Sequence, residues 1–157
     1  MRRRLLILIT LVLVTPWVLT QSLYLAVLGT LPRYPEKVRS SAPRPVSLAL
    51  WASMERGAPE MARLSLWDFV VGRRDRPGSM VTYAIAKDHI ARLDLQREWS
   101  RSKVWRSGFR WNVTVAALMV WISRHWSVEE VLSTWAARAN FGGDREGVEQ
   151  AANHYFG

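Results

Sequence analysis

The strongest hydrophobic pattern lies at the N-terminus. Residues 2–4 are three arginines, and residues 5–18 form a largely apolar run that resumes at residues 23–31. A helix needs about 20 predominantly apolar residues to cross the hydrocarbon of a bilayer. The pattern therefore predicts a single transmembrane anchor over residues 1–31, with a cleaved signal peptide as the alternative interpretation. Because cationic flanks stay on the cytoplasmic side, residues 32–157 are expected on the outer face.

Behind this segment the chain changes to a proline-rich stretch and then to helical spacing. Residues 32–46 contain four prolines and predict an extended linker. Behind Pro59, apolar side chains recur every three or four residues, which predicts a helix with this proline in its first turn. Residues 72–78 form a basic loop that ends this helix and is either solvated or in contact with anionic headgroups. These features place one domain at residues 47–157.

Further helices follow from the same periodicity. We expect a helix over residues 79–95 and a central buried helix over residues 113–122, which is apolar on nearly every side. Ser127 and Glu130 have the spacing of a capping box in front of an amphipathic stripe. Residues 142–143 are both glycine and predict a turn before a short last helix. No stretch alternates with period two, so the predicted fold class is mainly α.

Composition and charge narrow the choice of ligand. The chain has 22 basic and 13 acidic residues, a net charge of +9, and nearly all its cations are arginines, which suit bidentate contact with phosphate. This charge suits nucleic acid, anionic lipid or a phosphate-bearing ligand, and the predicted export favours lipid headgroups and lipid-linked phosphates and argues against nucleic acid. Tryptophans alternate with arginines over residues 97–111, a mixture that suits the membrane interface.

Metal and thiol chemistry find no support in the sequence. The chain contains no cysteine, which excludes thiolate catalysis and cysteine metal sites. His89, His125 and His154 lack the spacing of metal ligands. We therefore expect neither a metal nor a cofactor.

Two stretches carry a resemblance to a known family. Residues 123–157 are SRHWSVEEVLSTWAARANFGGDREGVEQAANHYFG, and residues 78–87 are GSMVTYAIAK. The first stretch resembles, without a gap, the C-terminal motif region of the family 51 glycosyltransferases, the peptidoglycan transglycosylases. The second resembles the family motif G-S-T-I-T-Q-Q-L-A-K. Its identical positions are Gly78, Ser79, Thr82, Ala86 and Lys87.

The resemblance implies a lysozyme-like transglycosylase domain behind one transmembrane helix. It places the protein in the bacterial inner (plasma) membrane, with the domain on the outer, periplasmic face. The family polymerises lipid II into glycan strands during cell-wall synthesis. A lipid-linked peptidoglycan precursor is therefore an expected partner, and other cell-wall synthesis proteins are further ones. Family members continue for several helices beyond the position of Gly157, so the resemblance describes an incomplete domain.

At the positions of the family's catalytic residues, this sequence departs from the family pattern. The catalytic glutamate belongs to an E-D-x-x-F-x-x-H-x-G motif before Gly57, where Glu55 is the only nearby carboxylate. A general base has to lie in a cleft beside the hydroxyl that it deprotonates, so Glu55 is either a surviving base or a solvated side chain. The second family glutamate corresponds to Val115, and Arg110 is a nearby cation that would act only electrostatically.

The predicted site combines Glu55 as a candidate base with Ser79, Thr82, Lys87 and Arg110 as candidate substrate-binding residues. The simpler interpretation makes Ser79 a helix cap and Lys87 a solvated side chain. The sequence thus predicts a peptidoglycan glycosyltransferase-like protein whose catalytic glutamates are lost, and it leaves open whether any catalysis survives. The alternative is a non-catalytic binding or scaffold protein for a lipid-linked precursor, an anionic membrane or a cell-wall synthase partner.

Overall fold

The fold is mainly helical in the residues that the computed structural model describes, which are 2–39, 41–73, 75–93, 104–141 and 146–156. Within them the extended structure is one isolated bridge between Asn140 and Glu146, and no strand forms, so the predicted mainly α class is confirmed. The helices in chain order are α1 (Arg2–Gly29), α2 (Arg44–Met54), α3 (Leu66–Val70), α4 (Ser79–Arg92), α6 (Val104–His125), α7 (Val128–Arg138) and α8 (Val148–Phe156).

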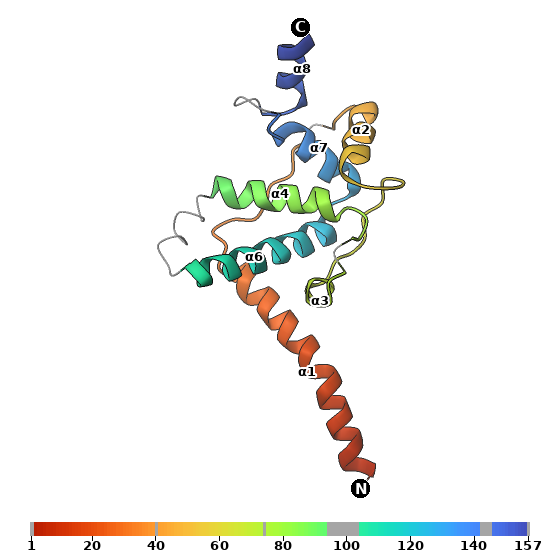
Figure 1. The fold of residues 1–157 in the computed structure, drawn as a ribbon, viewed down its shortest axis with the longest axis vertical. Helices are drawn as coiled ribbons and strands as arrows, with labels where there is room; N and C mark the ends of the chain where they lie inside the picture. The colour runs from red at the N-terminus through yellow and green to blue at the C-terminus, as the bar shows by residue number, and fades with distance from the viewer. Residues whose placement is uncertain (1, 40, 74, 94–103, 142–145, 157) are drawn as a thin grey trace.

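Helices α4 and α6 pack together at the centre of the body, and α7 covers α4 and α2 (Figure 1). Leu118 and Ile122 of α6 are fully buried, as are Val81 and Ile90 of α4. The predicted buried helix over residues 113–122 is therefore confirmed as part of α6. Its apolar character on nearly every side is explained by contacts with α1, α3 and α4 at once.

Helix α1 extends from the body as a stem, while α8 lies at the other end of the molecule (Figure 1). Near its C-terminal end α1 is docked on α6, because Tyr24 and Leu28 are buried and the guanidinium of Arg124 lies 5.3 Å from the centroid of the Tyr24 ring. Farther along the stem Trp17 is 63% exposed.

The predicted transmembrane anchor over residues 1–31 is wrong, and with it the single-pass localisation in the inner membrane. Spanning a bilayer requires both sufficient length and sustained apolar character. In the part of the chain that the structure describes, no helix combines the two.

The proline-rich stretch lies along the domain rather than apart from it. The Val38 N–H donates to Thr134 Oγ1 at 3.1 Å, and the Ala42 N–H donates to Ser133 Oγ at 3.0 Å. Both acceptors are buried on α7. Helix α2 begins at Arg44, so the last residues of the predicted linker are helical.

The helix predicted to begin near Pro59 starts later. Before α3, the Ala62 N–H donates to the Pro77 carbonyl at 3.0 Å, and the Leu64 N–H donates to Ser123 Oγ at 3.1 Å. Tertiary partners thus take the backbone donors that a helix would use internally. Ser65 and Asp68 form a capping box that starts the short α3 instead.

The predicted helix after residue 78 and the predicted capping box agree with the structure. Helix α4 begins at Ser79 and ends at Arg92. The capping box of α7 is present, with the Glu130 N–H donating to Ser127 Oγ at 3.2 Å and the Ser127 N–H donating to Glu130 Oε2 at 2.9 Å. The predicted glycine turn at 142–143, and the tryptophan and arginines at 97–101, lie outside the described residues.

Substitution of Gly147 tests the junction between α7 and α8. Gly147 has φ +84°, and an added Cβ would lie 2.8 Å from the Ala137 carbonyl oxygen. We expect Gly147→Ala to lower the free energy of unfolding by about 1–3 kcal/mol, measured by urea denaturation. Gly72→Ala is the matched control, because Gly72 has φ +75° but nothing within 4 Å of an added Cβ. Equal losses in the two variants would contradict a role for the close approach to α7.

Candidate functional site

The carboxylate of Glu55 caps the N-terminus of α4. Glu55 follows directly after α2, and its Oε1 accepts hydrogen bonds from the backbone N–H groups of Met80 at 2.7 Å and Val81 at 3.2 Å. The residue at the N-cap position is Gly78, which has φ 83° and no side chain to offer as an acceptor. Because the first N–H groups of a helix lack internal partners and carry partial positive charge, a carboxylate stabilises this end.

The loop after α2 holds Glu55 in place. Trp51 is 2% exposed, and its indole N–H donates to the Gly57 carbonyl at 3.0 Å. Gly57 itself has φ 80°. The chain therefore turns sharply behind α2 and stays close to the start of α4.

Ser79 and Thr82 lie in the first turn of α4, but they face different surroundings. Thr82 is fully buried, and its hydroxyl is directed at the backbone carbonyls of Gly78 and Ser79, 2.8 and 3.0 Å away. Ser79 is buried, and its small exposed part lines the two pockets described below. Ser79 is not the cap of α4, since Glu55 supplies the acceptor. The structure thus brings Ser79 beside Glu55 and directs the Thr82 hydroxyl into the helix.

Lys87 and Arg110 lie apart from this group. Lys87 is exposed two turns farther along α4, and Arg110 is exposed on α6. Neither lines a pocket together with Glu55 or Ser79. The five candidate residues therefore divide into a pair at the start of α4, one buried hydroxyl and two separate surface cations.

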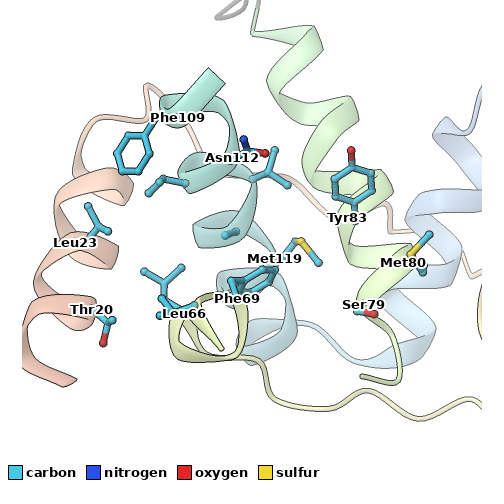
Figure 2. A pocket seen from close by; sticks show the side chains of 14 residues that line it. Thr20, Leu23, Leu66, Phe69, Ser79, Met80, Tyr83, Phe109, Asn112 and Met119 are labelled. Atoms are coloured by element: carbon cyan, nitrogen blue, oxygen red, sulfur yellow. The ribbon is translucent and has the colours of Figure 1, made fainter. Parts of the chain in front are cut away.

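An apolar pocket of about 500 Å³ lies between α1, α3, α4 and α6 (Figure 2). Its walls are mostly apolar, with polar groups from four side chains. The polar lining residues are Thr20, Ser79, Tyr83 and Asn112. The apolar lining residues are Leu23, Leu66, Phe69, Val70, Met80, Phe109, Val113, Val115, Ala116 and Met119.

A polar pocket of about 370 Å³ adjoins the apolar one. Ser79 and Met80 line both, so the start of α4 forms their common wall. The polar pocket is otherwise lined by Met54, Glu55, Arg56, Asp75, Arg76 and Pro77. The site is therefore amphipathic, with an apolar chamber on one side of Ser79 and two guanidinium and two carboxylate groups on the other.

Sequence reasoning did not find the apolar pocket. Val113, Ala116 and Met119 recur every three residues and form one wall, but they lie within the stretch predicted to be core. Apolar pockets and packed cores use the same side chains, so periodicity alone does not separate them. The pocket along α6 forms only through the positions of α1 and α3, which the sequence pattern does not give.

Asp68 stabilises the α3 wall of the apolar pocket. Its Oδ2 accepts from Ser65 Oγ at 2.7 Å and from the Ser65 N–H at 2.9 Å, and its Oδ1 lies 3.0 Å from a guanidinium nitrogen of Arg76. Burial by itself would raise the pKa of Asp68, but the two hydrogen bonds from Ser65 and the charges of Arg76 and Arg73 together hold the pKa below its usual value. The ionised carboxylate thus links α3 to the loop that enters α4.

Comparison of the chain with protein-family models, with curated proteins and with solved structures finds no match. The resemblance to the family 51 glycosyltransferases therefore stays a prediction. Within the described ranges, no group of three or more histidine, aspartate or glutamate side chains is arranged to hold a metal ion.

Removal of the carboxylate at the start of α4 should destabilise the domain. We expect Glu55→Ala to lower the free energy of unfolding by about 0.5–2 kcal/mol, because the Met80 and Val81 N–H groups lose their acceptor. Urea denaturation followed by circular dichroism measures the loss. Glu60→Ala is the matched control, since Glu60 is an exposed carboxylate a few residues away. A loss no larger than that of the control would show that the cap contributes nothing.

The Asp68 carboxylate should make stability depend on pH. Because its pKa is lower in the folded protein than the ordinary 3.8, its contribution is fully present above that value and is lost as the pH falls through the folded pKa. At pH 7 we expect Asp68→Asn to cost about 1–3 kcal/mol of unfolding free energy, because Ser65 and Arg76 lose a charged acceptor. Denaturant titrations at several pH values should show this difference shrinking below about pH 4. A difference that does not change with pH would contradict the assignment.

Proposed function

We propose that the domain is a non-catalytic binding module for a lipid-linked ligand with a sugar-phosphate head, of the class of the peptidoglycan precursor. One observation carries this proposal: an apolar pocket and a polar, charged pocket meet at Ser79 and Met80. A ligand with an apolar chain and a polar head would occupy both chambers across this common wall. The resemblance of residues 78–87 to a transglycosylase motif supports the same ligand class.

The two chambers offer complementary chemistry to such a ligand. The apolar pocket, at about 500 Å³, has the size and the mostly apolar lining of small-molecule binding sites, which suits part of a hydrocarbon chain. In the polar pocket Arg56 and Arg76 offer guanidinium groups, which match phosphate oxygens. Glu55 and Asp75 offer carboxylate oxygens, which accept hydrogen bonds from sugar hydroxyls.

The bonding of Glu55 favours binding over catalysis. A general base has to accept a proton from the reacting hydroxyl, and because Oε1 of Glu55 accepts two backbone hydrogen bonds from α4, only Oε2 is left to face a ligand. Val115, at the position of the second family glutamate, is 4% exposed and packs in the core. With one carboxylate engaged in capping and the other replaced, the site lacks the pair that the family reaction uses.

A peptidoglycan glycosyltransferase that uses Glu55 as its base is the second candidate. The observation in its favour is that Glu55 lines the polar pocket beside Ser79. Polymerisation of lipid II by the wild type, but not by a folded Glu55→Gln variant, would favour this candidate over the binding module. Glu60→Gln serves as the control for loss of a carboxylate on the same surface.

Binding of lipid II in detergent micelles tests the proposal. Leu23 of α1 lines the apolar pocket and is 41% exposed, whereas Leu25 lies outside the pocket lining and is 65% exposed. We expect Leu23→Asp to weaken binding by roughly tenfold or more, because a carboxylate would be desolvated against the hydrocarbon chain. Leu25→Asp introduces the same charge on the same helix and should leave the affinity within about twofold, because an exposed surface charge changes little.

The outcomes of this titration are distinct. Isothermal titration calorimetry of the wild type and both variants gives the dissociation constants, and circular dichroism confirms that each variant is helical. An equal loss in both variants would mean that micelles adsorb on the stem in general. No binding of lipid II by the wild type would overturn the proposal.

A further inference from the structure

A second pocket lies at the far end of α4 and has a different character. Its volume is about 540 Å³, and three segments enclose it: the chain after α1, the last turn of α4 and the end of α7. At 1.5 Å rise per residue, the turn of α4 that lines it is roughly 15 Å from the N-terminus of that helix. The side chains that matter for its chemistry are Arg33, Tyr34, Glu36, His89, Arg92 and Arg138.

The wall formed by the chain after α1 is held by two interactions. The ring nitrogen Nε2 of His89 lies 3.0 Å from the Arg33 carbonyl oxygen. Because a carbonyl oxygen only accepts, Nε2 carries the proton and donates to it. Tyr34 stacks on Trp121 of α6, with ring centroids 5.1 Å apart and planes at 21°. The pocket is therefore framed by packed side chains and is not a gap beside a free loop.

The side chains that line this pocket carry a net positive charge. Three guanidinium groups line it against the single carboxylate of Glu36. Arg92 is engaged on α4 with Asp88 at 2.7 Å and across to Glu146 at 3.3 Å. Arg33 and Arg138 form no ion pair with any residue that the structure describes. Two arginines thus keep their donors available at one cavity.

The buried histidine responds to this positive charge. Burial is the main cause that lowers the pKa of His89, and the charges of Arg138 and Arg33 lower it further, against the opposing effects of the Arg33 carbonyl and Asp88. His89 is 5% exposed. The imidazole of His89 is therefore uncharged at neutral pH, and the positive charge of the pocket comes from its arginines.

We propose that this pocket binds a phosphate-bearing ligand, a phosphomonoester or a diphosphate, through the guanidinium groups of Arg33 and Arg138. The planar fork of arginine matches two phosphate oxygens at once, and two unpaired guanidinium groups balance a dianion. A cavity of about 540 Å³ exceeds the volume of the anion itself, so an attached organic group has room beside the apolar side chains of Pro32 and Leu93. The site is separate from the amphipathic site at the start of α4 and goes beyond the proposed function.

Titration of the full chain with inorganic pyrophosphate tests this site. We expect Arg138→Gln and, separately, Arg33→Gln to weaken binding by roughly tenfold or more, the loss typical of one charge-assisted phosphate contact. Arg110→Gln is the matched control, because Arg110 is an exposed arginine that lines none of the described pockets. Equal weakening in all three variants would show that pyrophosphate responds only to net charge, and would overturn the proposal.

The imidazole of His89 provides a second readout. Bound anion should raise the pKa of His89, followed by nuclear magnetic resonance, because it offsets the charges of Arg138 and Arg33. In Arg138→Gln this rise should be reduced at the same pyrophosphate concentration. An unchanged His89 pKa in the wild type at saturating pyrophosphate would overturn the assignment to this pocket.

Binding to lipid vesicles distinguishes a lipid headgroup from a free phosphate compound as the ligand. Vesicles of phosphatidylglycerol are compared with pyrophosphate on the same variants. Loss of vesicle binding in Arg138→Gln but not in Arg110→Gln supports a lipid headgroup as the source, while loss of pyrophosphate binding alone supports a free phosphate compound. If Arg138→Gln reduces neither vesicle binding nor pyrophosphate binding, the proposal is overturned. Arg56 lines the polar pocket at the start of α4, so Arg56→Gln should leave the rise in the His89 pKa unchanged, which separates this site from the amphipathic one.

Discussion

The start of α4 exposes backbone N–H groups that α4 itself leaves uncapped, since Gly78 has no side chain. Glu55 supplies the acceptor from the end of α2, at 2.7 and 3.2 Å from the nitrogens of Met80 and Val81. This bond joins two helices that are distant in sequence and positions Ser79 and Met80 as the wall between the apolar and polar pockets. The cap stabilises this wall, because without it the N–H groups of Met80 and Val81 would lack an acceptor.

Two residues that the predicted resemblance aligns with family glutamates have structural roles here. One is Ser133, whose hydroxyl accepts the Ala42 N–H of the proline-rich stretch. Val115, at another glutamate position, is packed in the core. Both residues therefore contribute to the packing of the domain.

Most of the helices could be predicted because their causes are local. The capping box of Ser127 and Glu130 and the stripe behind it are complete within a few residues, and α7 forms where they predict it. The segment after Pro59 also has helical spacing, yet its backbone donors bond to Pro77 and Ser123, which periodicity does not reveal. Among the site residues, Ser79 could be assigned to a helix start, but its cap, Glu55, could not be identified from spacing.

The sequence by itself determined the fold class, the apolar segment of α6 at residues 113–122 and the basic, cysteine-free character of the chain, since these depend on composition and short-range periodicity. Tertiary structure alone decided the rest. It placed Glu55 at the start of α4, formed an apolar pocket between α6 and Leu23 of α1, and gathered Arg33 and Arg138 at one cavity. The physical reason is that each of these features joins segments far apart in the chain, whose contacts follow from packing and not from the pattern of any one segment.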